Sequence, residues 1–173
     1  MAITLYDATV SGFIQTIGAV GHLLKKGRTH CEEHRIDLVT VLDSRIFPNM
    51  LPFRYQVQAA IGHSVHAVEG VKSGVFKPPY GAPTADWSAL QTSVAEALEK
   101  LKAYTPDEIN ALESKDVVFD LGERKLEFLG AGFLMSFSVP NVHFHATTAY
   151  DLLRAAGVPL GKGDYMGRVK LKG

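Results

Sequence analysis

Cysteine is almost absent from this chain of 173 residues, since Cys31 is the only one. A single cysteine excludes an intrachain disulfide framework and a metal site built from a cysteine cluster. The composition fits a reducing compartment, and we predict a cytoplasmic location. Cys31 itself is more typical of a small core residue than of a nucleophile.

An excess of charge is also lacking, because 18 Lys and Arg residues balance 18 Asp and Glu residues. No dense basic stretch supplies the charge that nucleic-acid binding needs, so we expect no nucleic-acid partner. No apolar run approaches the roughly 18 residues of a membrane span, and the first residues, MAITLYDATV, lack the pattern of a signal peptide. We therefore expect no membrane partner. A neutral chain has little repulsion between copies, and we predict a homodimer.

Apolar residues recur at helical spacing along most of the chain, which predicts one helical domain over residues 1–173. The predicted helices cover residues 9–26, 38–46, 53–71, 87–102, 106–114 and 139–154. Asp37, Asp86, Thr105 and Ser138 are their predicted N-caps. Gly157 is the predicted stop of the last helix, and we expect loop beyond it.

Other segments break the helical pattern. Residues 117–129, VVFDLGERKLEFL, alternate around Gly122 and predict a β-hairpin. Residues 74–86 are rich in proline and predict a long irregular connection. Glycines at 130 and 132 predict another break, and Gly27 is a possible end of the first helix.

Two separated segments carry a resemblance to a known family: residues 44–60, SRIFPNMLPFRYQVQAA, and residues 144–165, FHATTAYDLLRAAGVPLGKGDY. They resemble the domain-of-unknown-function family DUF1993, one of the DinB-like (YfiT-like) helical families, and the similarity extends from Tyr6 to Tyr165. The resemblance implies an all-α fold, namely an antiparallel four-helix bundle, here with a small β-hairpin before the last helix. It also implies a first helix that continues towards His30 or beyond. The resemblance does not imply any known reaction.

His145 is the strongest single candidate for a functional residue, because it shares a helix face with apolar residues. A buried imidazole has two ring nitrogens to satisfy. One interpretation is a core histidine hydrogen-bonded to Thr148, Gln56 or a backbone carbonyl. The other is a general acid or base in a site. The residues leave both open.

The resemblance places further polar residues at motif positions, and helical bundles build their sites from side chains on facing helices. We therefore expect a pocket between the first, second and last helices, closed by residues 74–86. The candidate catalytic residues are His145 and His30. The candidate substrate-binding residues are Gln56, Gln58, Thr148, Tyr150 and Arg45. For Arg45, capping a helix end or bridging loops is the favoured alternative.

A divalent metal is a less favoured interpretation, and we predict no cofactor. His30 and His34, in HCEEH, have the spacing that puts two imidazoles on one helix face, but Cys31 stands where the zincin pattern has glutamate. The DinB-like proteins that bind metal typically have an HxxxH pair on the last helix. This sequence has His145 there but Ala149 four residues on. A metal would thus need His145 with His30 or His34.

The remaining histidines of the second helix are predicted to be solvated. His63 and His66 point away from its buried stripe, which Gln56 and Gln58 border. The stripe consists of Phe53, Val57, Ala60, Ile61, Val68 and Val71.

Three functional hypotheses follow, and the sequence leaves open whether the protein is an enzyme. The first is a metal-independent small-molecule enzyme or binder in which His145 moves a proton and the glutamines orient a polar substrate. The second is a divalent-metal-dependent thiol transferase or hydrolase of DinB-like type. The third is a non-catalytic dimeric bundle whose buried polar residues fix helix register.

Overall fold

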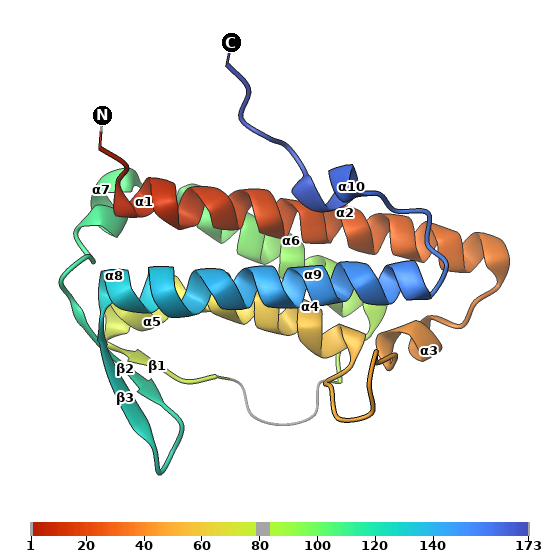
Figure 1. Cartoon of the computed structure of the whole chain (residues 1–173), viewed down its shortest axis with the longest axis horizontal. Helices are drawn as coiled ribbons and strands as arrows, with labels where there is room; N and C mark the ends of the chain where they lie inside the picture. The colour runs from red at the N-terminus through yellow and green to blue at the C-terminus, as the bar shows by residue number, and fades with distance from the viewer. Residues whose placement is uncertain (1, 79–83, 173) are drawn as a thin grey trace.

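The computed structural model describes residues 2–78 and 84–172, and long helical runs form its body (Figure 1). The first is α2 (Val10–His34), and the third is α6 (Trp87–Ala103). The second consists of α4 (Phe53–Ile61), the π-helix η1 (Gly62–His66) and α5 (Ala67–Ser73). The fourth consists of α8 (Gly130–Gly132), the π-helix η2 (Phe133–Ser138) and α9 (Val139–Ala155). No helix in the described part of the chain is long and apolar enough to cross a membrane.

Contacts between the runs show their directions. The indole Nε1 of Trp87, at the start of α6, donates to the carbonyl of Leu24 at 3.2 Å. Val94, later in α6, lies beside Gly21, earlier in α2, so α2 and α6 are antiparallel (Figure 1). Gln56 contacts His145 near the start of α4, while η1 meets η2, so α4 and α9 are also antiparallel. Because α2 and α9 run the same way (Figure 1), α4 and α6 do too. The end of α5 and the start of α6 therefore lie at opposite ends of the body, and the connection 74–86 joins them (Figure 1). Its residues 79–83, and with them the predicted closure of the pocket, lie outside the described residues.

Gly27 does not end the first helix, which continues to His34 as the resemblance implied. A Cβ at Gly27 would lie 3.1 Å from Leu153 on α9 and 3.1 Å from Trp87 on α6. The glycine thus lets three helices approach closely, and the local breaking tendency of glycine is outweighed by this packing. The prediction of Asp86 as the N-cap of α6 is confirmed, since its carboxylate accepts from the amide of Ala89 at 2.8 Å.

The last helical run begins earlier than predicted. Ser138 has helical backbone angles, is fully buried and is not an N-cap, because the run extends back through η2 to Gly130. Gly130 is needed for close approach, since a Cβ there would lie 2.1 Å from the carbonyl oxygen of Leu112. Pro140 has no N–H to donate in mid-helix, and the wider π-turn before it accommodates the interruption. The predicted stop is confirmed: Gly157 has φ +88°.

The predicted hairpin is confirmed as β2 (Asp116–Asp120) and β3 (Lys125–Leu129), which pair antiparallel. The described residues also contain a strand that was not predicted, β1 (Val75–Phe76), which pairs parallel to β2. Two residues are too few to show an alternating pattern. The fold is therefore mostly helical, and the predicted hairpin is part of a small three-stranded sheet of order β1-β2-β3. Phe119 fixes the sheet to η2, because its ring lies 4.9 Å from that of Phe137.

Short helices complete the chain. Those at α3 (Leu38–Leu42) and α7 (Pro106–Asn110) begin at the predicted caps Asp37 and Thr105, whereas α1 (Leu5–Ala8) was not predicted. A loop was expected after Gly157, but α10 (Lys162–Met166) packs there on α2.

Asp164 of α10 accepts hydrogen bonds from the Gly161 amide, His22 and Lys26. These hydrogen bonds together lower its pKa to about 2.

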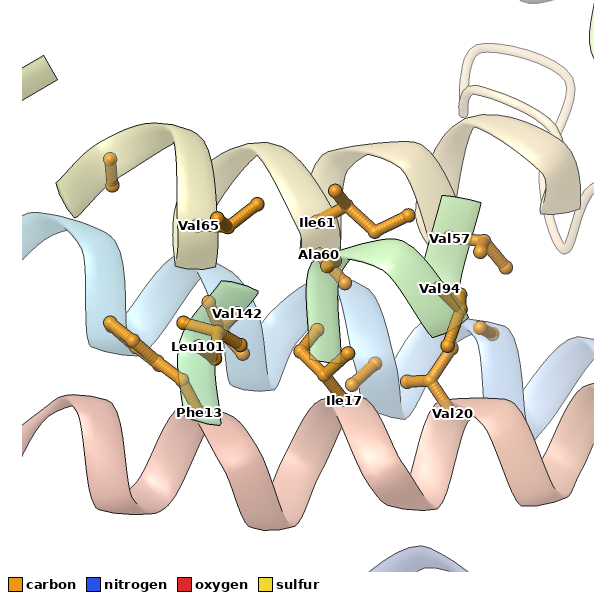
Figure 2. Packing of buried hydrophobic residues seen from close by; sticks show 14 of the residues in the cluster. Phe13, Ile17, Val20, Val57, Ala60, Ile61, Val65, Val94, Leu101 and Val142 are labelled. Carbon is orange, nitrogen blue, oxygen red and sulfur yellow. The ribbon is translucent and has the colours of Figure 1, made fainter. Parts of the chain in front are cut away.

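Apolar side chains from all the long runs meet in a single core, part of which Figure 2 shows. The labelled residues are Phe13, Ile17, Val20, Val57, Ala60, Ile61, Val65, Val94, Leu101 and Val142. Cys31 is buried in this core as predicted, and burial raises the pKa of its thiol. A buried thiol of raised pKa is a poor nucleophile.

Two glycines of α2 provide a test of the close helix approach. Gly27→Ala puts a methyl group against Leu153 and Trp87, whereas a Cβ at Gly18 has nothing within 4 Å. Both substitutions gain helix propensity, but only the first overpacks the core. We expect the free energy of unfolding of Gly18→Ala to exceed that of Gly27→Ala by about 1–3 kcal/mol in urea denaturation. Equal values for the two variants would contradict the packing role of Gly27.

Candidate functional site

The candidate site is centred on His145, whose Nδ1 lies 2.8 Å from Oε1 of Gln56. The other end of this amide is also fixed, because Nε2 of Gln56 donates to the carbonyl of Leu51 at 2.8 Å. A carbonyl can only accept, so the amide nitrogen faces Leu51 and the amide oxygen faces His145. The Nδ1 of His145 must therefore carry the proton. Its Nε2 is left with a lone pair and is a hydrogen-bond acceptor.

His63 lies against His145, which the sequence did not predict. The two rings are nearly parallel, at 11°, with their centroids 5.8 Å apart. On its other sides the His63 ring meets Phe76 at 5.7 Å and Phe137 at 5.4 Å. Its Nδ1 is buried and has no hydrogen-bond partner among the described residues. The surface prediction is thus wrong for His63, while His66 is exposed as expected.

A signal for His63 was present in the sequence. His63 follows Gln56 by seven residues, which is two helical turns, so the two side chains fall on one helix face. Gln56 was placed at the border of the buried stripe, and His63 extends that border. The π-turn of η1 then sets His63 beside α9, and such turns are frequent at functional sites.

Aromatic rings form the other contacts of the site. Tyr55 meets His145 edge-on at 5.9 Å, and Phe144 does so at 5.2 Å. Phe144 is 59% exposed although it is large and apolar. The site thus combines two imidazoles with aromatic rings that contact them.

Both imidazoles are neutral at pH 7. Burial lowers the pKa of His145 to about 4, and burial together with the neighbouring His145 lowers the pKa of His63 to about 4. The physical cause is the loss of hydration of the charged form. A neutral imidazole has one hydrogen-bond donor and one acceptor, and these two rings become protonated only in acidic solution.

The structure does not bring His30 or His34 to His145. His30 lies beside Gly157, twelve residues beyond His145, or roughly 18 Å along a helix axis. Its ring is stacked on that of His34 at 4.1 Å, and Nδ1 of His34 bonds the His30 carbonyl at 2.9 Å. The two histidines form a separate pair at the far end of α2.

The other predicted site residues are dispersed. The Thr148 hydroxyl donates to the Phe144 carbonyl at 2.7 Å, which satisfies it within its own helix. The ring of Tyr150 packs against that of Tyr165 of α10, with the ring centroids 6.1 Å apart.

Gln58 and Arg45 also lie away from the His145 site or are bonded elsewhere. The side chain of Gln58 points about 200° round the helix axis from that of Gln56. Arg45 donates to the Met50 carbonyl at 3.1 Å and bridges its own loop, which is the structural alternative considered above.

The residues present do not fit a divalent metal. Within residues 2–78 and 84–172, no group of three or more His, Cys, Asp or Glu side chains is placed to hold one ion. His145 has an imidazole neighbour in His63, but no carboxylate or thiolate from the described part of the chain joins them to form such a group.

Comparison with solved structures shows that the fold is similar to that of a DinB family member. A DinB family member protein from Shewanella denitrificans superimposes with a TM-score of 0.83 at 24% sequence identity, over 98% of this chain and 95% of that one. The family model described as "Domain of unknown function (DUF1993)" matches residues 5–166. The chain belongs to the DUF1993 family, as its two sequence motifs indicated. No curated protein matches it.

The lowered pKa values predict a characteristic pH dependence of stability. An unfolded histidine titrates near pH 6.5, and both folded ones near 4, so the unfolded chain binds more protons between these values. The unfolding free energy should therefore fall as the pH falls from about 6.5 to about 4, by at most about 1.4 kcal/mol per pH unit for each histidine, and level off below.

Urea denaturation at pH 7 and pH 5 checks this dependence. The wild type should lose more stability between the two values than the double variant His63→Phe, His145→Gln, in which these groups no longer titrate. Other titrating groups contribute equally to both proteins and cancel in the comparison. Equal losses would show that the two histidines titrate normally.

Proposed function

We propose that this protein is a small-molecule-binding protein whose site is formed by His145 and His63 between the second and fourth helical runs. We interpret the long runs as the four-helix bundle of the DinB-like type, in which such sites lie between facing helices. The observation that carries the proposal is the orientation of His145. Gln56 fixes the ring so that Nε2 keeps a free lone pair. The predicted homodimer and cytoplasmic location stay predictions.

Binding is better supported than acid–base catalysis at neutral pH. A general base is most effective when its pKa is near the working pH, and the pKa of His145 is about 4. An imidazole of such low basicity accepts a hydrogen bond from a ligand without removing its proton. An enzymatic role for His145 stays a second candidate, since a bound substrate changes the surroundings of the ring.

The main competitor is a purely structural polar network. In its favour, the hydrogen bonds from Leu51 through Gln56 to His145 tie two helices together. Against it, a network evolved for stability should satisfy its members, and Nδ1 of His63 has no partner among the described residues. A buried polar atom without a partner is costly, so His63 does not stabilise the fold through this atom.

Fragment binding to His145 variants tests the proposal. A panel of one-ring and two-ring fragments is screened by saturation-transfer NMR against the wild type, His145→Ala and His143→Ala. His143 lies on the same helix but is exposed, so it is a matched control. We expect fragments that bind the wild type and His143→Ala but lose at least tenfold in affinity for His145→Ala, because the ring that accepts the hydrogen bond is gone.

The structural alternative predicts a different pattern. No fragment should then depend on His145, and His145→Ala should chiefly lower the free energy of unfolding, by about 1–3 kcal/mol, because the amide of Gln56 loses a partner. Thermal and urea unfolding of the same three proteins distinguish the two cases. Hits that bind His145→Ala as well as the wild type would also contradict the proposal.

A further inference from the structure

The two imidazoles of the site differ in what they can offer a ligand. His145 presents an acceptor, because its Nδ1 proton is committed to Gln56. In His63 the buried Nδ1 has no partner among the described residues. A buried N–H without an acceptor is rarer in proteins than a buried lone pair without a donor. The favoured neutral form of His63 therefore carries its proton on Nε2 and presents a donor.

Among the described residues no carboxylate, lysine or arginine shifts the pKa of either histidine: burial lowers both pKa values, and the neighbouring His145 adds to the effect on His63. The ring neighbours of the two histidines are Tyr55, Phe76, Phe137 and Phe144. The charged residues that are adjacent in sequence to Tyr55 and Phe76 form ion pairs with other residues. Arg54 forms an ion pair with Asp43 at 2.8 Å, and Lys77 does so with Asp120 at 3.3 Å. An ionised ligand would therefore lose hydration among aromatic rings without gaining a partner of opposite charge. For a cation, attraction to the aromatic rings returns only about 0.5–2 kcal/mol of that loss.

From these two observations we infer that the site binds an uncharged, flat molecule that carries a hydrogen-bond donor and an acceptor side by side, as a carboxamide, a lactam or a pyrimidinone does. The inference rests on the proposed binding function and adds the chemical class of the ligand. The ligand N–H donates to Nε2 of His145, and the ligand carbonyl accepts from Nε2–H of His63. The aromatic side chains enclose its flat ring.

Two charged relatives of a carboxamide lack this match. A carboxylate has only acceptors, so it faces the lone pair of His145 unfavourably. An amidinium has only donors, so it faces the N–H of His63 unfavourably. Leaving polar groups unpaired in a buried site discriminates strongly between molecules of the same shape. Benzamide, benzoate and benzamidine have nearly the same size, and they differ in these groups alone.

Titration of the wild-type chain with benzamide, benzoate and benzamidine at pH 7.5, followed by ¹H–¹⁵N NMR of the histidine side chains, tests the inference. We expect benzamide to bind at least tenfold more tightly than either charged probe. The variant His63→Phe keeps an aromatic ring and removes the donor, and it should weaken benzamide binding at least fivefold. His66→Phe is the control, because His66 is exposed on the same π-helix.

The outcomes separate this inference from the function on which it rests. If benzoate or benzamidine binds to the histidines as tightly as benzamide, the ligand class is wrong and the binding site stands. If benzamide binds equally well to His63→Phe, the donor assigned to His63 is wrong. If none of the three probes binds, the inference fails, and the fragment panel then decides whether the binding function fails with it.

Discussion

The hydrogen bond between Gln56 and His145 joins two antiparallel helices whose contact defines the candidate site. Its geometry depends on a backbone group, because the Leu51 carbonyl fixes the Gln56 amide from outside the helix. The register that it sets has a further effect. Further along the second run lies His63, and further back along the fourth run lies Phe137. The rings of these two residues are in contact. One polar pair thus aligns the histidines and the aromatic rings around them.

The parts of the fold that were predictable depend on short-range interactions. Asp86 bonds an amide three residues away, and Thr105 and Glu108 cap each other within one turn. Such interactions can be recognised in a sequence because both partners stand within a few letters. Gly27 and Gly130 could not be interpreted in this way. In both cases glycine permits close approach to a distant segment, so the residue that usually breaks a helix lies within one.

The site was only partly predictable for the same reason. Gln56 was expected at the border of an apolar stripe and His145 on one, which made their pairing one of the expected alternatives. His63 shares a face with Gln56, but a π-turn and contacts with Phe76 and Phe137 are needed to bury it, and no local pattern specifies those. His30 was expected in the pocket, whereas its place beside Gly157 follows from the parallel course of α2 and α9.

The order in which the chain is synthesised gives these contacts a consequence for folding in the cell. Gln56 and His145 are 89 residues apart, and His22 and Asp164 are 142 apart. The second helical run is therefore made long before its partner α9, and its apolar face stays uncovered in the meantime. Contacts between distant segments form late because closing long loops costs entropy. Until α9 leaves the ribosome, the nascent chain cannot cover that face with the contacts that α9 makes in the folded protein.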